Sequence, residues 1–198
     1  MRPRLLLSIA AGLAVIVAVV VGLSQAPKTD TSPRASTFNL AKAQASLAGS
    51  PAKLDALHRQ ASKLLPGAKT AVKAQLAALK GTPVLINKWA SWCGPCRAEF
   101  PFLQDASTRY GKQVAFLGLN SGDNAADAAR FLRKFPVPYP SVEDPKEQAA
   151  GALHAFTAYP VSLFYDAQGK QVFAHAGLYS SQAQLDADIQ KYLLAGSR

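Results

Sequence analysis

The chain has 198 residues, enough for one domain with residues to spare, and a formal net charge of +10. The charge is concentrated near the N-terminus. Residues 1–80 hold 11 Lys and Arg against 2 Asp and Glu, a net of +9, whereas residues 81–198 hold 11 against 10, a net of +1. A nearly neutral C-terminal part without a docking motif argues against a nucleic-acid partner, and the basic leader suits a surface of anionic lipid or cell-wall polymer.

The N-terminal region has the pattern of a membrane anchor. Leu5–Leu23 is a run of 19 residues whose only polar member is Ser8, and Arg2 and Arg4 precede it. As a helix this run would be about 28 Å long, close to the hydrocarbon thickness of about 30 Å. The flanking charges predict that residues 1–27 form a cytoplasmic N-terminus and a single-pass signal anchor in the cell membrane. A cleaved signal peptide, and hence secretion, is the alternative, although its apolar core is normally only about 7–15 residues long.

A basic, partly helical stalk is predicted over residues 28–66, ahead of a folded domain over residues 67–198. Residues 24–50 are rich in Ala, Ser, Thr, Lys and Pro, which is typical of a flexible segment. Leucines and alanines then recur at helical spacing over residues 52–65 and 68–79. We expect the second of these helices to pack on the domain. The first could be a stalk helix or an additional layer, and its Ala and Lys content favours a solvated helix over a second domain.

The remainder of the chain alternates between apolar runs and amphipathic segments. The expected elements, in chain order, are a buried strand over residues 84–89, a helix over 97–110, a strand over 113–120, a helix over 124–134 capped by Asp123, a helix over 145–156, two strands over 161–165 and 171–175 joined by a turn, and a helix over 180–194. With the two consecutive helices over 124–134 and 145–156 counted as one connection, this β-α-β-α-β-β-α order predicts an α/β thioredoxin fold, with a mixed central sheet flanked by helices.

Cys93 and Cys96 are the only cysteines, and they lie between the predicted strand over residues 84–89 and the helix that follows it. A Cys-x-x-Cys at such a junction is typical of thiol–disulfide redox sites. A structural disulfide would close too short a loop to stabilise the fold much, so reactivity is the better explanation. The three histidines are scattered, and Arg97 rather than His follows the second cysteine, which disfavours zinc binding and covalent haem attachment. No cofactor or metal is therefore predicted.

The position of the two sulfurs at a helix start predicts their roles. Unpaired N–H groups and the positive end of the helix dipole favour a thiolate at Cys93, which we expect to be the nucleophile. Cys96 lies one turn along and resolves the mixed disulfide that Cys93 forms with a partner. Pro95, in the first helical turn, lacks an N–H that would have no partner there. Gly94, Pro95 and Trp92 border the cysteines and are expected to contact the substrate.

Residues 87–101, Asn-Lys-Trp-Ala-Ser-Trp-Cys-Gly-Pro-Cys-Arg-Ala-Glu-Phe-Pro, resemble the signature of membrane-anchored TlpA/ResA-type thioredoxin-like proteins. The resemblance continues through Tyr159-Pro160 and Phe164-Tyr165-Asp166, and covers roughly residues 68–195. Two features depart from the family. Lys88 stands where many relatives have Phe, and Tyr-Pro-Val-Ser replaces Pro-Thr-Thr around the proline.

The resemblance assigns expected roles to further residues. It implies that Glu99 influences thiol ionisation, and Asn87, in place of the buried aspartate of ordinary thioredoxins, favours this role; spacing alone leaves a solvated carboxylate equally open. It also implies that Pro160 is cis and that the backbone of Tyr159 pairs with an extended partner segment. We expect Trp89 in the core, and Trp92 over the sulfur.

Lys88 admits two interpretations. Its stem could pack in the core while the ammonium reaches water or a carboxylate, which we favour, or its charge could stabilise the thiolate. Its direction does not follow from sequence.

The predicted function is that of an extracytoplasmic thiol–disulfide oxidoreductase. The resemblance implies that it reduces disulfides in exported proteins, such as apocytochrome c during cytochrome c maturation, and takes electrons from a membrane partner of thiol–disulfide type. The Gly94-Pro95 pair resembles that of thioredoxin and favours the reducing direction. The alternatives are a disulfide-forming oxidant of the same fold and, less favoured, a non-catalytic haem or metal chaperone. A peroxidase is disfavoured because its reactive cysteine is typically separate from any such dithiol.

Overall fold

The computed structural model describes residues 38–155 and 158–195. The predicted anchor, Leu5–Leu23, lies outside these residues, and so does the expected flexible segment as far as residue 37. No helix in the described part of the chain combines the length and apolar character needed to cross a bilayer.

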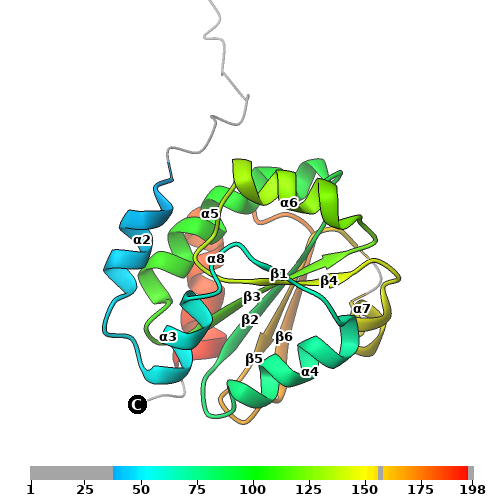
Figure 1. Cartoon of the computed structure of the whole chain (residues 1–198). Coiled ribbons are helices and arrows are strands. Elements are labelled where there is room, and N and C mark those ends of the chain that lie inside the picture. The colour runs from blue at the N-terminus through cyan, green and yellow to red at the C-terminus, as the bar shows by residue number, and fades with distance from the viewer. Residues whose placement is uncertain (1–37, 156–157, 196–198) are drawn as a thin grey trace, which may run out of the picture. The chain divides into compact units, whose positions relative to one another are not determined.

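A six-stranded mixed sheet forms the centre of the fold, in the order β1-β4-β3-β2-β5-β6 (Figure 1). The first four strands in this order are parallel, whereas β2 pairs antiparallel with β5, and β5 with β6. The strands are β1 (Leu64–Leu65), β2 (Val84–Trp89), β3 (Ala115–Ser121), β4 (Ser141–Asp144), β5 (Val161–Tyr165) and β6 (Gln171–Ala176).

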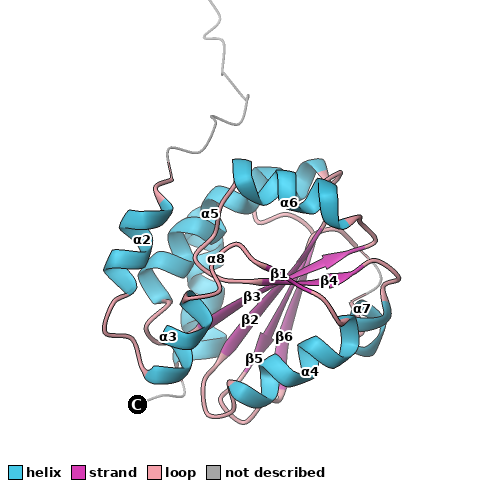
Figure 2. Ribbon diagram, in the orientation of Figure 1, coloured by secondary structure: helices cyan, strands magenta, loops and turns pink. Residues whose placement is uncertain are grey.

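Helices cover both faces of this sheet (Figure 2). One face packs against α5 (Gly94–Tyr110), α6 (Ala125–Lys134) and α8 (Gln182–Ile189), which continues as a π-helical turn over Gln190–Leu194. The other face packs against α3 (Ala52–His58), α4 (Ala68–Ala78) and α7 (Gln148–Ala152). This three-layer arrangement confirms the predicted α/β fold of the thioredoxin type.

The segment expected as a stalk is part of the packed unit where the structure describes it. Leu40–Leu47 forms α2, which lies against α5, and its Leu47 is buried. The helix predicted over residues 52–65 ends at His58, and Leu64–Leu65 adds strand β1 to the edge of the sheet. Burial of the leucines of α2 and α3 against the domain stabilises these elements, and their local composition does not reveal that surface.

Two further elements differ from the predicted list. Ser141–Asp144 forms β4, a strand for which no element was predicted, and the helix expected over residues 145–156 is the five-residue α7. Ser141 and Val142 complete the sheet between β1 and β3, so pairing with two flanking strands stabilises a segment that is too short to predict from pattern.

The alternation of side chains along β2 presents two polar residues to opposite layers. Leu85 and Trp89 belong to the core beneath α5, whereas Ile86 belongs to the core beneath α4. By the same alternation Asn87 faces the α5 layer and Lys88 the α7 layer. Both residues are buried, with 1% and 0% of their surface exposed, so each needs polar partners within the protein.

Candidate active site

Cys93 and Cys96 form a disulfide at the start of α5, with their Cα atoms 5.3 Å apart. Cys93 is the N-cap residue, and its Sγ accepts a hydrogen bond from the backbone N–H of Cys96 at 3.0 Å. Pro95 occupies the first turn, as predicted. Cys93 is 3% exposed and Cys96 is fully buried. In the reduced protein the same N–H group would donate to a Cys93 thiolate at the positive end of the helix.

Asp123 holds the loop that precedes the cysteines. Its carboxylate accepts hydrogen bonds from the Ser91 backbone N–H at 2.6 Å, from the Ser91 hydroxyl at 2.9 Å and from Asn120 Nδ2 at 2.8 Å. Asp123 is therefore not the helix cap that we predicted. Asn124 caps α6 instead, its Oδ1 accepting from the backbone N–H of Asp127. Asp123 follows β3, and the carboxyl ends of the parallel neighbours β2 and β3 meet at this edge, which brings it to the loop.

Glu99 is buried in α5, one turn beyond Cys96, with 1% of its surface exposed. Its carboxylate accepts hydrogen bonds from Asn87 Nδ2 at 2.7 Å and from the backbone N–H of Tyr179 at 3.2 Å. Burial raises the pKa of Glu99 from 4.5 to about 7, although these two hydrogen bonds favour the ionised form and oppose the shift. The solvated carboxylate that spacing left open is therefore wrong.

Tyr159 and Pro160 are joined by a cis peptide bond, as the resemblance implied. The Tyr159 ring lies 4.8 Å from the ring of Trp92, which is 59% exposed and donates from Nε1 to the carbonyl oxygen of Gly122 at 3.0 Å. A Cβ atom at Gly122 would lie 2.8 Å from the Tyr159 hydroxyl, and its φ of +59° also favours glycine. Trp89 is in the core, as expected, and Trp92 is exposed. That Trp92 lies over the sulfur of Cys93 stays a prediction.

Lys88 lies behind the Tyr159 ring, on the α7 side of the sheet. Its Nζ donates to the carbonyl oxygen of Ala155 at 2.8 Å, lies 3.3 Å from Glu147 Oε1 and sits 3.7 Å from the centroid of the Tyr159 ring. The Tyr159 hydroxyl donates to the same Glu147 oxygen at 2.5 Å. These groups lower the pKa of Glu147, the tyrosine hydrogen bond most of all. The expectation that the ammonium reaches a carboxylate is confirmed, and Glu147 is a partner that sequence reasoning missed.

The fold brings most of the predicted site residues to one end of the sheet. The disulfide and Trp92 come directly after the C-terminal end of β2. The Tyr159–Pro160 bond comes directly before the start of β5, and these two strand ends pair with each other. Glu99 lies one turn below the disulfide, inside the protein. Gly94 and Pro95 are exposed at the start of α5, where a partner can reach them. Within residues 38–155 and 158–195, no three His, Cys, Asp or Glu side chains gather as a metal site.

Comparison with known proteins identifies relatives. The model of the AhpC/TSA family matches residues 60–173. "Thiol-disulfide oxidoreductase ResA" of Bacillus subtilis (strain 168) is 29% identical over 99 residues, which are 50% of this chain and 55% of that protein. "Thiol:disulfide interchange protein DsbE" of Pseudomonas fluorescens biotype C is 32% identical over 127 residues, 64% of this chain and 67% of the relative. The chain thus spans little more than half the length of the ResA relative.

Solved structures of similar fold include a crystal structure from Chlorobium tepidum that was assigned as a thiol:disulfide interchange protein DsbE. It is 30% identical, with a TM-score of 0.54, and the match covers 59% of this chain and 84% of that one. A solved structure of DsbF from MTB, in mixed oxidised and reduced forms, is 24% identical with the same TM-score, and supports the fold alone.

Proposed function

Because this chain belongs to the AhpC/TSA family, we propose that it is an extracytoplasmic thiol–disulfide oxidoreductase that works through the Cys93–Cys96 pair. The observation that carries the proposal is the disulfide at the N-terminus of α5, next to the cis Tyr159–Pro160 bond. The ResA and DsbE names of the relatives support the same reaction type. We propose the reducing direction, because Gly94-Pro95 separates the cysteines as it does in thioredoxin.

The reaction is a two-electron exchange in two steps. The Cys93 thiolate attacks one sulfur of a partner disulfide, which forms a mixed disulfide and releases the other partner sulfur as a thiolate that takes up a proton. Deprotonated Cys96 then attacks the Cys93 sulfur, closes the Cys93–Cys96 disulfide and releases the second partner thiolate. The dithiol has lost two electrons and the partner disulfide has gained them. The reverse sequence, from a membrane donor of thiol–disulfide type, restores the dithiol.

Glu99 is the proposed proton acceptor for the buried sulfur. Cys96 is fully buried and must lose a proton before it can attack, and water does not reach it. A carboxyl group one helical turn away, with a pKa of about 7, can accept that proton near neutral pH and return it in the next cycle. Asn87 and the Tyr179 backbone N–H hold the carboxylate in place.

The partners proposed are exported proteins with disulfides, such as apocytochrome c, and the extended segment of each would pair with the Tyr159 backbone. The cell membrane is the proposed location, with residues 5–23 as the single span and the redox domain on the extracytoplasmic side; the apolar length of that run and its flanking arginines support this.

The reduction potential of the Cys93–Cys96 couple in the full chain tests the direction. We would equilibrate the protein with defined thiol–disulfide buffers and read the reduced fraction. A value near that of thioredoxin, about −270 mV, is expected for a reductase. A value near that of DsbA, about −120 mV, would make the protein a disulfide-forming oxidant. Failure of the wild type to outpace Cys93→Ser in insulin reduction would contradict the redox function itself and favour a non-catalytic binding module.

A further inference from the structure

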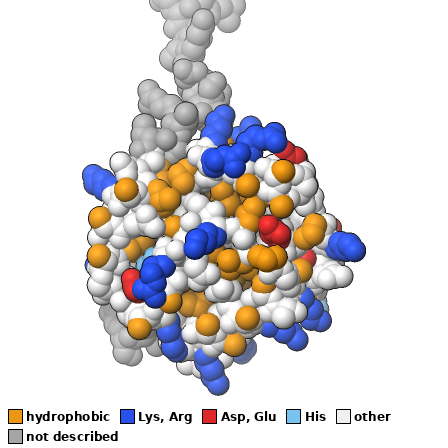
Figure 3. All heavy atoms as spheres, in the orientation of Figure 1, with side chains coloured by type: hydrophobic (Ala, Val, Ile, Leu, Met, Phe, Trp, Pro, Cys, Tyr) orange, Lys and Arg blue, Asp and Glu red, His pale blue; other side chains and the backbone are white. Residues whose placement is uncertain are grey.

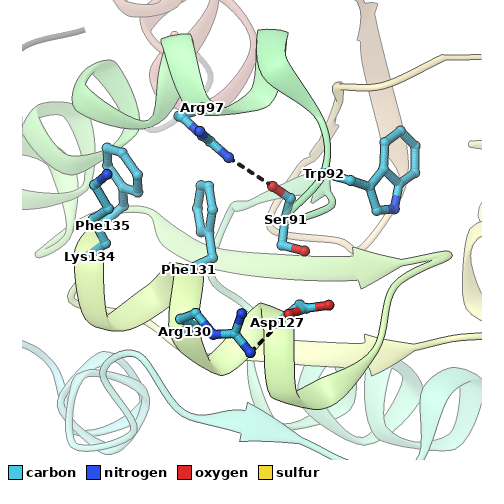
Figure 4. Close-up of a pocket in the computed structure, with 8 residues that line it drawn as sticks. All are labelled: Ser91, Trp92, Arg97, Asp127, Arg130, Phe131, Lys134 and Phe135. Carbon is cyan, nitrogen blue, oxygen red and sulfur yellow. Dashed lines mark hydrogen bonds and ion pairs between the residues drawn. The ribbon is translucent and has the colours of Figure 1, made fainter.

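A hollow of about 350 Å³ lies between the start of α5 and the exposed side of α6, beside the cysteines (Figure 4). Ser91 and Trp92, which directly precede Cys93, form the wall nearest the disulfide. Asp123 holds the backbone and hydroxyl of Ser91, so this wall is anchored. The function proposed above does not use this hollow.

The rim of the hollow is positively charged. Arg97, Arg130 and Lys134 line it together with one carboxylate, that of Asp127, so the local balance is three cations against one anion, or +2. Asp127 lies 3.2 Å from Arg130, but both side chains are well exposed, so this pair is weak. Among the described residues, Arg97 and Lys134 form no ion pair. Figure 3 shows Lys and Arg side chains gathered over α6.

Aromatic rings back these cations. The Arg97 guanidinium lies 5.9 Å from the ring centroid of Phe131, and the Lys134 ammonium 5.8 Å from that of Phe135. Arg97 also donates to the Ser91 carbonyl oxygen at 3.2 Å, which directs its guanidinium toward the Ser91–Trp92 wall of the hollow (Figure 4). The hollow therefore offers carboxylate-binding groups beside an indole that is 59% exposed. A cationic segment would be repelled there by the net positive charge of the hollow.

From this arrangement we infer that the hollow binds an acidic segment of the disulfide-bearing protein partner, close to the cysteine that Cys93 attacks. The inference rests on the proposed redox function, because the mixed disulfide at Cys93 holds the partner chain next to Trp92 and Ser91. The complementary charge favours carboxylates of that chain at Arg130 and Lys134, and apolar neighbours of those carboxylates contact Trp92. The site would select among partners by the charge around their cysteines.

The test uses the reduced full-length chain and a set of peptides, each closed by one disulfide. The peptides differ only in the residues next to one of their cysteines. These positions, on both sides of that cysteine, carry Glu, Gln or Lys in turn. The rate of protein oxidation is followed by tryptophan fluorescence. We expect the Glu peptide to react about tenfold faster than the Lys peptide at low salt, and this ratio to shrink at about 0.5 M salt. Taking the ratio within one variant cancels any general change in reactivity.

The charge-reversing double variant Arg130→Glu/Lys134→Glu is expected to abolish or invert the ratio. Its matched control, Lys112→Glu/Lys170→Glu, makes the same change in net charge at exposed lysines of the opposite end of the sheet, after α5 and in the β5–β6 turn, and should keep it. A wild-type ratio near one, or an equal effect of the control, would overturn the inference.

The remaining outcomes separate this inference from the proposed function. If the wild-type protein reduces no peptide faster than the Cys93→Ser variant does, the proposed redox function is wrong. If the wild type reduces all peptides at equal rates, only the inference about the hollow is wrong. If the rates are equal and the charge reversal instead weakens binding to phosphatidylglycerol vesicles, the hollow is a lipid-headgroup site and the inference is wrong.

Discussion

Replacing Glu99 by Gln should change how the stability of the oxidised protein depends on pH. The buried carboxyl has a pKa of about 7, against 4.5 in its ordinary state. The folded protein therefore binds a proton more tightly than the unfolded chain does, and this contribution to stability is fully present below about pH 4.5. It is lost as the pH rises to about 7 and is absent above that. The difference corresponds to about 3 kcal/mol of unfolding free energy.

The substitution removes this titration at a modest cost. At pH 4.5 the wild-type group is a protonated carboxyl with one O–H donor, whereas the amide carries two N–H donors and faces the donors Asn87 Nδ2 and the Tyr179 N–H, so one donor is left without an acceptor, which costs about 1 kcal/mol. Asn87 can offset part of that cost, because its buried Oδ1 has no partner and could accept from the new amide if the side chain rotated. The variant should thus be about 1 kcal/mol less stable than the wild type at pH 4.5 and about 2 kcal/mol more stable at pH 8.

Urea unfolding of both proteins between pH 4.5 and 8, followed by tryptophan fluorescence, to which the buried Trp89 contributes, measures the two curves. Glu143→Gln, a glutamate substitution on β4, is the control and should keep the wild-type slope. Parallel curves for the wild type and Glu99→Gln would refute the reasoning, since they would show that Glu99 is ionised in the folded protein throughout this range.

Three further predictions follow from the site. Cys96→Ser should trap the mixed disulfide between Cys93 and a substrate, visible as a covalent adduct by mass spectrometry; no adduct would argue against the assigned order of attack. Glu147→Gln should destabilise the protein more than Lys88→Met, by about 2 kcal/mol in urea unfolding, because it leaves a buried ammonium without its counter-charge; the opposite order would count against the ion pair. Gly122→Ala should lower stability by about 2 kcal/mol and Gly169→Ala by only about 1, since both have positive φ but only the first would crowd the Tyr159 hydroxyl; equal melting temperatures would contradict this.

The redox motif could be predicted because its features are local. A buried strand, a Cys-x-x-Cys and an amphipathic helix follow one another within residues 84–110. This order alone places Cys93 at the start of the helix. The hairpin of β5 and β6 was equally accessible, since its turn and its alternating strands are adjacent in sequence.

The segment ahead of residue 67 was not predictable in the same way. The sequence pattern of an alanine- and lysine-rich helix is the same whether the helix is solvated or packed. Only the presence of an apolar surface on the folded domain, against which the helix can pack, distinguishes the two cases. Leu54 and Leu57 are each 2% exposed because α4 and the sheet cover them. The strand β1 likewise exists because β4 offers an unpaired edge.

The sequence by itself determined the Cys-x-x-Cys pair, the class of fold and the helix start around Cys93, because each depends on neighbouring residues and on side-chain periodicity. The tertiary structure decided what the polar groups around the cysteines do. Glu99 receives its hydrogen bond from Tyr179, 80 positions away, and Lys88 donates to Ala155, 67 positions away. Burial of Glu99, with its shifted pKa, and of the Lys88 ammonium arises only when such distant segments close over a side chain and exclude water.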